Sequence, residues 1–580
     1  ILALKLTGLL RNLLGDYFYI SALIETPTIA QLAESIEEHH PDALTNKDRS
    51  TTTAAEQLPT VEPNHADRYE RFPLTDIQLI EASAGTGKTY TITALYLRLL
   101  LGLSNVRQGE KLGPKQILVV TFTEAATEEL RDRIRGRIGE ARRIFQRGEA
   151  DDPLLQALLD QYPEHDKAAE LLEMAAREMD EAAIFTIHGF CQRMLSQHAF
   201  ESGSLFENEL IQDETPWLRQ ALLDFWRNCL YGLSPAVCKA MLQLWKTPDE
   251  LLRELRPWLH TVDLTLKPQL PEIDLDEAYA RRSAQIDQFC AQWLACEEDL
   301  AALIAGSDIN KRSYTKARTP QWLAALTQWA ERGGEPDKET LKVIARFRQS
   351  TLDEASKSKP PQHALFTQLD QLAESEVPLR ELMLQQAYRE VGAALAKAKA
   401  DRRLLAFDDL LSGLGRALMD DPQQLLASAI RQQFPVALID EFQDTDPQQY
   451  RIFSTLYGGQ ADCGLIMIGD PKQAIYAFRG ADIFTYIAAR RAVMQPWTLD
   501  TNWRSTSDMI RAVNRLFDQC ATPFIYDQDI PFQPVNAAGK ADKTPLTLAG
   551  KPLSALQVWQ SDELLTRSRY RQQFSRATAA

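Results

Sequence analysis

Five short aliphatic runs constrain the fold of this chain more than any other feature of its sequence. None of them alternates apolar with polar residues, and each leads into a polar, glycine-containing or carboxylate-bearing segment: QLIEASAGTGKT, ILVVTFTEAAT, AIFTIHGF, PVALIDEFQD and GLIMIGDPKQ. Such runs are typical of strands covered on both faces, as in a parallel sheet flanked by helices. Ligands of open parallel sheets bind outside the carboxyl ends of the strands, where all five polar segments fall. The sequence therefore predicts an α/β fold with a ligand site along one edge of a parallel sheet.

A region of different amino-acid composition lies between two of these runs. Between about Phe206 and Arg402 the chain is rich in Leu, Ala, Gln and Glu at helical spacing, which predicts a large all-helical insertion between strands. Aromatic side chains at helical spacing usually pack in a core, and stacking on nucleic-acid bases is the alternative. We interpret the tryptophans of this region as core residues; they are Trp217, Trp226, Trp245, Trp258, Trp293, Trp322 and Trp329.

Length and composition set the number and kind of domains. A chain of 580 residues is long enough for about three to four domains. Hydrophobic residues make up 44% of it and charged residues 25%, which excludes a disordered, collagenous or coiled-coil protein. The predicted segments are a helical region 1–40, a linker 41–71, the sheet domain in two parts (72–205 and 403–495), the helical insertion 206–402, the start of a second sheet domain 496–560, and an unstructured tail 561–580.

Charge and cysteine content restrict the partners and the compartment. The formal net charge of −16 repels polyanions at long range, so a nucleic-acid site must be a local basic track. The seven cysteines form no CxxC pair, which predicts free thiols, no zinc site and a cytoplasmic location. The apolar run ALYLRLLLGL from Ala94 is short and interrupted by Arg98, so we predict no membrane association.

The first polar segment has the form of a phosphate cradle. The small residues before the lysine allow backbone N–H groups to turn toward phosphate oxygens, and the helix that follows favours an anion at its N-terminus. Lys88 adds a charge for the β and γ phosphates, and Thr89 is a ligand for Mg²⁺. Ala82 stands where the G-x-x-x-x-G-K-[ST] pattern has its first glycine. The predicted ATP-binding residues are Ala82, Ser83, Ala84, Gly85, Thr86, Gly87, Lys88 and Thr89.

A carboxylate pair supplies the rest of the predicted site. Asp440, at the end of a buried strand, is a candidate Mg²⁺ ligand, and Glu441 is a candidate base for an attacking water. Asp444 and Asp446 are further candidates, and helix capping is the alternative for acidic residues in this position.

Two polar side chains later in the chain complete the predicted catalytic set. Gln473 follows a strand by one short loop, where its amide is able to contact both the γ-phosphate and the catalytic water. Arg504, in LDTNWRS, is a candidate arginine finger, a group that speeds turnover by about 10³- to 10⁵-fold in other nucleotide hydrolases.

Taken in order, these strings resemble the motifs of a known family. IEASAGTGKT, VVTFTEAATEELRDRI, IFTIHGFCQRML, IDEFQDTDPQQYRIF, IGDPKQAIYAFRGADIFTY and LDTNWRS resemble motifs I, Ia, Ib, II, III and IV of the UvrD/Rep-like superfamily 1 DNA helicases, and specifically of their RecB branch. The resemblance runs from about Leu79 to about Trp559. It implies a P-loop RecA-like sheet, and an ATP- and Mg²⁺-dependent motor that moves 3′ to 5′ on single-stranded DNA. It also implies RecC-like and RecD-like partner subunits and a role in recombinational repair of double-strand breaks.

The resemblance also assigns residues. Lys88 and Thr89 match the Walker A pair, Asp440 and Glu441 the Walker B pair, Gln473 the motif III glutamine and Arg504 the motif IV arginine. The positions matching DNA-contacting residues are Thr121, Phe122, Thr186, His188, Tyr476, Phe478 and Arg479. Aromatic faces among them suit base stacking; a buried role is the alternative for His188, Phe122 and Phe478. The arginines at 131, 133, 135 and 137 spread around a helix, so a solvated face competes with a DNA track.

Two departures from the family pattern accompany the match. After motif IV we find no motif V, no motif VI and no nuclease core, so we expect a truncated second RecA-like domain. An ATP- and DNA-binding fragment without unwinding activity is the alternative function. Residues 1–75 resemble the later helices of a nonribosomal peptide synthetase carrier domain without its phosphopantetheine serine, and an ordinary helical extension is the alternative there.

Overall fold

The computed structural model describes residues 64–65, 72–202, 208–261, 264–476, 481–548, 551–556 and 564–579. The carrier-like segment 1–40 lies outside the described residues, as do Phe478 and Arg479 and nearly all of the predicted linker. The described chain falls into two compact units, one comprising residues up to Ser202 and from Leu410 onward, the other lying between Asn208 and Asp409. Each unit is considered by itself below.

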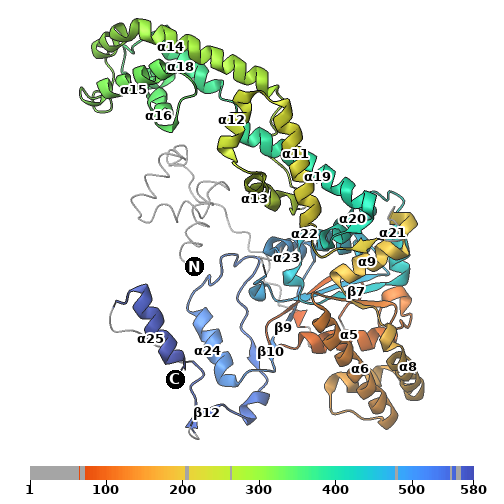
Figure 1. Ribbon diagram of the computed structural model, residues 1–580. Coiled ribbons are helices and arrows are strands. Elements are labelled where there is room, and N and C mark those ends of the chain that lie inside the picture. Colours follow the sequence, from red (N-terminus) through yellow and green to blue (C-terminus); the bar gives the residue numbers. More distant parts are fainter. Residues whose placement is uncertain are drawn as a thin grey trace. The chain divides into compact units, whose positions relative to one another are not determined.

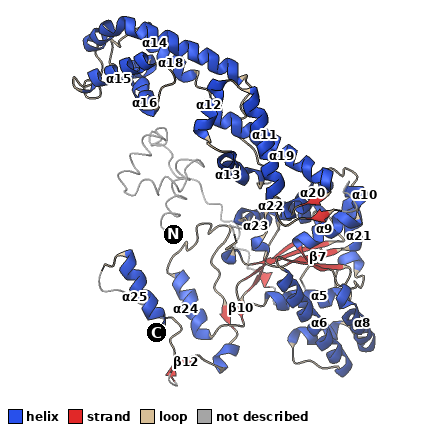
Figure 2. Ribbon diagram, in the orientation of Figure 1, coloured by secondary structure: helices blue, strands red, loops and turns tan. Residues whose placement is uncertain are grey.

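The first unit contains a parallel sheet, drawn as the red strands around the label β7 in Figure 2. Its strand order is β1-β9-β2-β8-β7-β3-β4. Neighbouring strands in it pair in parallel, so the carboxyl ends of the strands lie along one edge. All five aliphatic runs of the sequence form strands of this sheet, which confirms the predicted fold class. The strands are β1 (Asn64–His65), β2 (Asp76–Ala82), β3 (Ile117–Thr121), β4 (Ile184–Thr186), β7 (Val436–Ile439), β8 (Gly464–Gly469) and β9 (Trp497–Leu499).

Helices cover both faces of the sheet (Figure 1). On one face lie α5 (Lys88–Leu100), α6 (Glu124–Arg147), α7 (Pro153–Gln161) and α8 (His165–Glu178). On the other lie α9 (Ile187–Gln197), α21 (Leu425–Gln433), α22 (Pro447–Tyr457) and α23 (Ile483–Ala492). This arrangement explains why β3, β7 and β8 are buried along their whole length.

Helix α6 illustrates how the sequence produces this layer. Thr123 caps its first turn by accepting a hydrogen bond from the backbone N–H of Ala126 at 3.2 Å. The apolar stripe then recurs every three to four residues and is buried, while charged residues occupy most of the other positions. The stripe consists of Leu130, Ile134, Ile138, Ala141 and Phe145.

The first unit contains several further elements. Before the second unit come η1 (Val106–Gln108), η2 (Met179–Glu181) and α10 (Ala199–Ser202). After it come η3 (Phe442–Asp444), η4 (Pro471–Gln473), β10 (Thr501–Asn502), α24 (Ser507–Asp518), β11 (Asn536–Ala537), η6 (Lys540–Lys543), β12 (Thr547–Leu548), β13 (Lys551–Pro552) and α25 (Arg567–Ala579). Helix α20 (Phe407–Met419) crosses the boundary between the units.

The second unit is helical apart from one short strand pair, β5 (Glu209–Leu210) with β6 (Leu404–Leu405). Its helices form two apolar cores, one from α11 to α13 with α19 and one from α14 to α18. The bounds are α11 (Thr215–Gly232), α12 (Pro235–Leu244), α13 (Pro248–Leu259), α14 (Leu275–Gly306), α15 (Arg318–Arg332), α16 (Lys338–Phe347), α17 (Gln349–Glu354), α18 (Ala364–Glu374) and α19 (Leu379–Arg402).

The tryptophans of this unit belong to those cores, which confirms their interpretation as packing residues. Trp293 and Trp329 are fully buried and flank the ring of Phe289. Each indole N–H is satisfied, by Thr327 Oγ1 at 3.0 Å and by the Gly334 carbonyl at 2.9 Å respectively. Stacking on nucleic-acid bases is therefore not available to these two rings.

None of the helices in the described residues has the length and apolar character that crossing a bilayer requires.

Replacing Trp329 by Ala should lower the free energy of unfolding of the helical unit by about 3 to 5 kcal/mol, because it leaves a cavity beside Phe289 and an unpaired Gly334 carbonyl. Urea denaturation followed by tryptophan fluorescence measures this. The control is Tyr231→Ala, since Tyr231 is 89% exposed and its loss should change the free energy by no more than about 0.5 kcal/mol. Equal effects of the two substitutions would contradict the packing described here.

Candidate functional site

The loop between β2 and α5 has the backbone of an anion cradle. Gly85 and Gly87 both have left-handed conformations, with φ of 81° and 97°. Gly87 occupies the N-cap of α5, so no side chain caps the first turn, and no acidic residue lies there. Thr86 is buried and bonds back to the Ser83 carbonyl through its hydroxyl at 2.8 Å. The N-terminus of α5 therefore adjoins a loop whose backbone is shaped for a negatively charged ligand.

Asn502, at the end of β10, clamps this loop and was not identified from the sequence. Its side-chain amide donates to the Ala84 carbonyl at 2.7 Å, and its carbonyl oxygen accepts from the backbone N–H of Arg504 and Ser505. The backbone N–H of Trp503 donates to the Gly85 carbonyl at 2.9 Å. These bonds hold the segment that carries Arg504 against the cradle. An Asn before a bend carries no distinctive signal, which is why the sequence did not reveal it.

The contacts of the 502–504 segment also explain why residue 85 is a glycine. A Cβ at this position would lie 2.9 Å from both the Arg504 Cβ and the Asn502 Nδ2. The cradle is thus closed on one side by the 502–504 segment, and only glycine combines the left-handed φ with the available space.

The carboxylates after β7 meet the cradle. Lys88 Nζ is hydrogen-bonded to Glu441 Oε2, although the two residues are 353 positions apart in the chain. Asp440 is the residue before Glu441, and its backbone N–H donates to the Val120 carbonyl of β3 at 3.0 Å. Glu441 has a left-handed backbone (φ 50°), uncommon for a residue other than glycine, which redirects its side chain from the strand toward Lys88. The structure therefore brings the predicted lysine and carboxylate pair into one site.

The electrostatics of the site favour a cation. Burial raises the pKa of Asp440 to about 6, and the neighbouring Glu441 charge adds to this, while Lys88 opposes it. Burial and Glu441 likewise raise the pKa of Asp444 to about 6, and its Oδ1 has no partner among the described residues. Carboxylate oxygens whose negative charge is disfavoured by burial are suited to binding a hard divalent ion such as Mg²⁺. The residues present thus fit both a triphosphate and its metal.

Asp446 has the helix-capping role that we gave as the alternative. Its carboxylate accepts from the Gln449 backbone N–H at 2.8 Å, and the Asp446 backbone N–H donates to Gln449 Oε1 at 3.3 Å, which forms a capping box at α22.

The predicted Gln473 lies on η4, directly after β8. Its amide donates to Asp470 Oδ2 at 2.7 Å, and Lys472 Nζ lies 2.9 Å from the other oxygen of the same carboxylate. Asp470 is 2% exposed, so this buried carboxylate fixes the loop that carries Gln473. Arg504 is exposed on its own segment beside the cradle.

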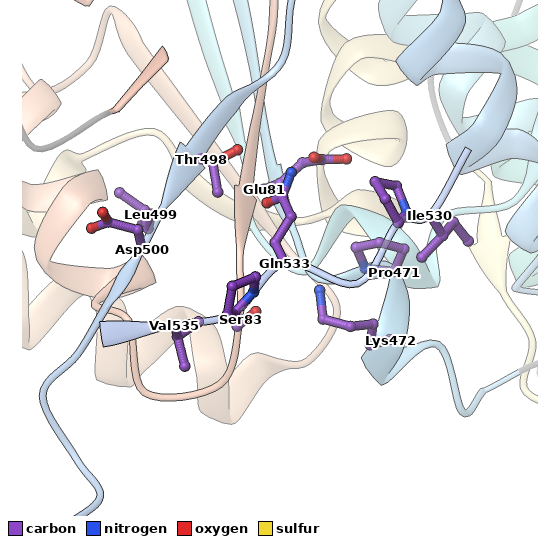
Figure 3. A pocket seen from close by; sticks show the side chains of 12 residues that line it. Glu81, Ser83, Pro471, Lys472, Thr498, Leu499, Asp500, Ile530, Gln533 and Val535 are labelled. Carbon is purple, nitrogen blue, oxygen red and sulfur yellow. The ribbon is translucent and has the colours of Figure 1, made fainter. Parts of the chain in front are cut away.

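A small pocket adjoins the cradle on the β9 side (Figure 3). Ser83 and Lys472 line it together with Asp500 and Gln533. Glu81 also faces it; its buried carboxylate is bound by Arg490 Nε at 2.7 Å and by the Tyr486 hydroxyl at 3.2 Å. The ends of β2, β8 and β9 and the segment 530–535 therefore share one edge with the cradle.

The residues expected to contact DNA differ in accessibility. Phe122 and Tyr476 expose 37% and 40% of their surface, and His188 is half-buried. Thr121 is buried, and its hydroxyl lies 2.6 Å from the hydroxyl of Thr127, so its side chain holds the turn instead of facing solvent. Thr186 caps α9 through the Gly189 N–H and bonds to Glu124.

The arginines of α6 are mostly engaged by acidic residues. Arg133 pairs with Glu129, Arg135 with Asp180, and Arg137 with Glu140 and Asp152. These contacts match the interpretation of a solvated helix face better than that of a DNA track.

Comparisons with known proteins agree with this geometry. Residues 64–493 match the family model of the UvrD/REP helicase N-terminal domain. Curated relatives named RecBCD enzyme subunit RecB include those of Escherichia coli (strain K12), 46% identical over 84% of this chain, and of Haemophilus influenzae (strain ATCC 51907 / DSM 11121 / KW20 / Rd), 36% identical over 85%. A third, from Buchnera aphidicola subsp. Acyrthosiphon pisum (strain APS), is 34% identical over 82%. The alignments span 42%, 44% and 41% of these relatives' own lengths, so the chain matches about two-fifths of each.

Gly85→Ala should weaken ATP binding by at least about tenfold, because a left-handed L-residue costs about 1 to 2 kcal/mol and the added Cβ displaces Asn502. Fluorescence titration with a labelled ATP analogue measures the Kd. Gly136→Ala is the control: it lies within α6, where a Cβ would meet no atom within 4 Å. Unchanged affinity of the Gly85 variant would show that the loop does not need this conformation.

Asp440→Asn should stabilise the protein without ligand at pH 7 by about 2 to 3 kcal/mol. The pKa of Asp440 is raised to about 6, so from about pH 4 to 6 the folded protein keeps a proton that the unfolded chain has lost. The free energy of unfolding therefore decreases as pH rises through this window; the variant lacks the part of this decrease that comes from Asp440 and keeps the part that comes from Asp444. Urea denaturation between pH 4.5 and 7.5 tests it, with exposed Asp132→Asn as control. Parallel pH profiles for wild type and Asp440→Asn would be the contrary result.

Proposed function

Because this chain belongs to the UvrD/Rep helicase family, we propose that it is an ATP-dependent DNA motor of the RecB type. The observation that carries the proposal is the contact between Lys88 of the phosphate loop and Glu441 after β7. It joins the two halves of a nucleotide hydrolase site, one of which precedes the helical insertion in the sequence and the other of which follows it.

In the proposed mechanism the loop 82–89 binds the triphosphate through its backbone N–H groups. Thr89 and Asp440 would hold Mg²⁺, which when bound would neutralise charge on the β and γ phosphates. Lys88 turns from Glu441 to the phosphates, and Glu441 is then free to accept the proton of the attacking water. Gln473 and Arg504 contact the γ-phosphate region from the two segments that adjoin the cradle.

Single-stranded DNA is the proposed track. Phe122 and Tyr476 offer exposed aromatic faces for stacking on bases, a contact worth about 1 to 3 kcal/mol each and tolerant of sequence. Thr186, His188, Phe478 and Arg479 complete the proposed DNA surface, and Thr121 supports it by holding the turn before α6. We propose translocation in the 3′ to 5′ direction.

The proposed setting follows from the relatives' name. Proteins called RecBCD enzyme subunit RecB are parts of a multisubunit enzyme, so RecC-like and RecD-like subunits are the proposed partners. Recombinational repair of double-strand breaks in the cytoplasm is the proposed process.

A second candidate is an ATP- and DNA-binding protein that does not unwind DNA. The chain spans about two-fifths of each relative named above, and the two candidates differ in whether this segment couples ATP hydrolysis to DNA. DNA-stimulated ATP hydrolysis separates the two candidates.

Phosphate release from the 580-residue chain should increase when single-stranded DNA is added. Lys88→Ala should lower this activity by about 10²- to 10³-fold, because it removes the charge on the phosphates. Glu441→Gln should lower it by about 10²- to 10⁴-fold while ATP binding persists, because only the base is lost. Lys115→Ala, a change at a lysine 57% exposed beside Glu181, is the matched control.

Absence of DNA-stimulated hydrolysis in a folded sample would favour the second candidate. Full activity of Lys88→Ala would contradict both candidates, since each requires ATP in this cradle.

A further inference from the structure

Helix α25, dark blue in Figure 1, is a strongly basic element of an acidic chain. Between Leu564 and Ala580 the sequence has four arginines, no lysine and no acidic residue. The chain as a whole has a formal net charge of −16. Such a chain needs a local basic track to bind a polyanion, and α25 has the composition of one.

The guanidinium groups of Arg567, Arg569 and Arg571 are available to an external anion. All three residues are exposed, and none has an ion pair or a side-chain hydrogen bond within the described part of the chain. In α6, by contrast, arginines at the same spacing are paired with acidic residues. The arginines of α25 therefore have charge that no neighbour neutralises.

Helix α25 has no buried face among residues 567–575. Phe574 is half-buried and stacks on Tyr570 one turn earlier, with ring centroids 4.5 Å apart, and the other side chains of this range are exposed. A helix of 13 residues without a buried face is only marginally stable in water. The sequence analysis predicted an unstructured tail here, and a ligand bound to the arginines would stabilise the helix against that state.

The arginines lie on opposite sides of α25. Arg567 and Arg571 are four positions apart and share one side, whereas Arg569 lies about half a turn away from each. Cations on two sides suit a helix that lies between two rows of phosphates. The major groove of B-DNA is about 12 Å wide, admits one α-helix and has a phosphate backbone along each edge. The planar fork of arginine also matches the geometry of a phosphate group.

Two other polyanions fit this helix less well. A single strand presents one row of phosphates and is held by open aromatic faces, but the rings of Tyr570 and Phe574 stack on each other. An anionic bilayer binds helices that have a broad apolar face, and residues 567–575 offer only this aromatic pair. Charge and shape together therefore favour duplex DNA.

We infer that α25 is a duplex-DNA-binding helix that contacts the phosphates of both strands through Arg567, Arg569 and Arg571. The contacts are to the backbone, so binding is independent of base sequence. This surface shares no residue with the phosphate loop or with the single-strand surface proposed above. The inference therefore goes beyond the proposed function and does not depend on ATP.

The test measures the affinity for duplex DNA and its dependence on salt. The ligand is a fluorescein-labelled duplex of 20 base pairs, closed at both ends by hairpin loops so that frayed single strands are excluded. The Kd of the 580-residue chain is determined by anisotropy without nucleotide, between 50 and 200 mM NaCl. Each phosphate contact contributes about one to the slope of log Kd against log salt concentration.

Arg567→Gln, Arg569→Gln and Arg571→Gln together should weaken duplex binding at least about tenfold at 100 mM NaCl and lower the salt slope by about 2 to 3. The matched control makes the same change of net charge at three exposed helical arginines that already have acidic partners, and its Kd should stay within about threefold of wild type. The control arginines are Arg133, Arg177 and Arg511.

Limited digestion with trypsin locates the contact on the wild-type chain. Trypsin cleaves after arginine, so mass spectrometry of the released peptides reports the accessibility of α25 directly. Duplex at about ten times its Kd should slow cleavage after the arginines of α25 by about tenfold. Cleavage after Arg177, which is 77% exposed on α8, is the internal reference and should not change.

Several results would overturn the inference. They are wild-type affinity and salt slope in the triple variant, an equal loss in the matched control, and unchanged cleavage of α25 in the presence of duplex. A triple variant that loses affinity for dT20, or for vesicles of phosphatidylserine and phosphatidylcholine, but keeps its affinity for the duplex would also overturn it. Lys88→Ala should bind the duplex as wild type does, so a failure of ATP binding, which refutes the proposed function, is a distinguishable outcome.

Discussion

The contact between Lys88 and Glu441 determines the organisation of the first unit. The two residues are 353 positions apart, and the whole helical unit lies between them in sequence. They meet because β2 and β7 both pair with β8 in parallel, which places the ends of β2 and β7 at the same edge. The register of β8 with its neighbours therefore decides whether a site exists at all.

The carboxylates at this edge of the sheet outnumber the ammonium group that lies among them. Asp440, Glu441 and Asp444 approach one another with Lys88 as the ammonium group among them, and the pKa of both aspartates is raised to about 6. Burying like charges costs free energy that a folded protein without function has no reason to retain. A divalent cation and a polyphosphate relieve this imbalance together, and the uncapped start of α5 adds favourable dipoles for the phosphates. The stability and the ligand preference of the site thus have the same electrostatic origin.

Sequence analysis predicted those parts of the structure that depend on local pattern. Aliphatic runs indicate strands buried on both faces, and Gly-Thr-Gly-Lys-Thr indicates the cradle, because backbone conformation and local charge are properties of a few consecutive residues. The role of Asn502 was not predictable in this way. It depends on a contact with a distant segment, the hydrogen bond to the Ala84 carbonyl. For Thr121 the motif predicted an exposed residue that contacts DNA. In the structure its hydroxyl is instead hydrogen-bonded to the hydroxyl of Thr127.

The central claim is that Lys88, Thr89 and Asp440 surround one metal–triphosphate complex. Electron paramagnetic resonance of Mn²⁺, added with a nonhydrolysable ATP analogue, tests it most directly. The account predicts one tightly bound Mn²⁺ per chain that requires the nucleotide, shows coupling to phosphorus, and loses affinity in both Thr89→Val and Asp440→Asn. Bound Mn²⁺ that is indifferent to both substitutions, or nucleotide binding without any bound metal, would contradict it.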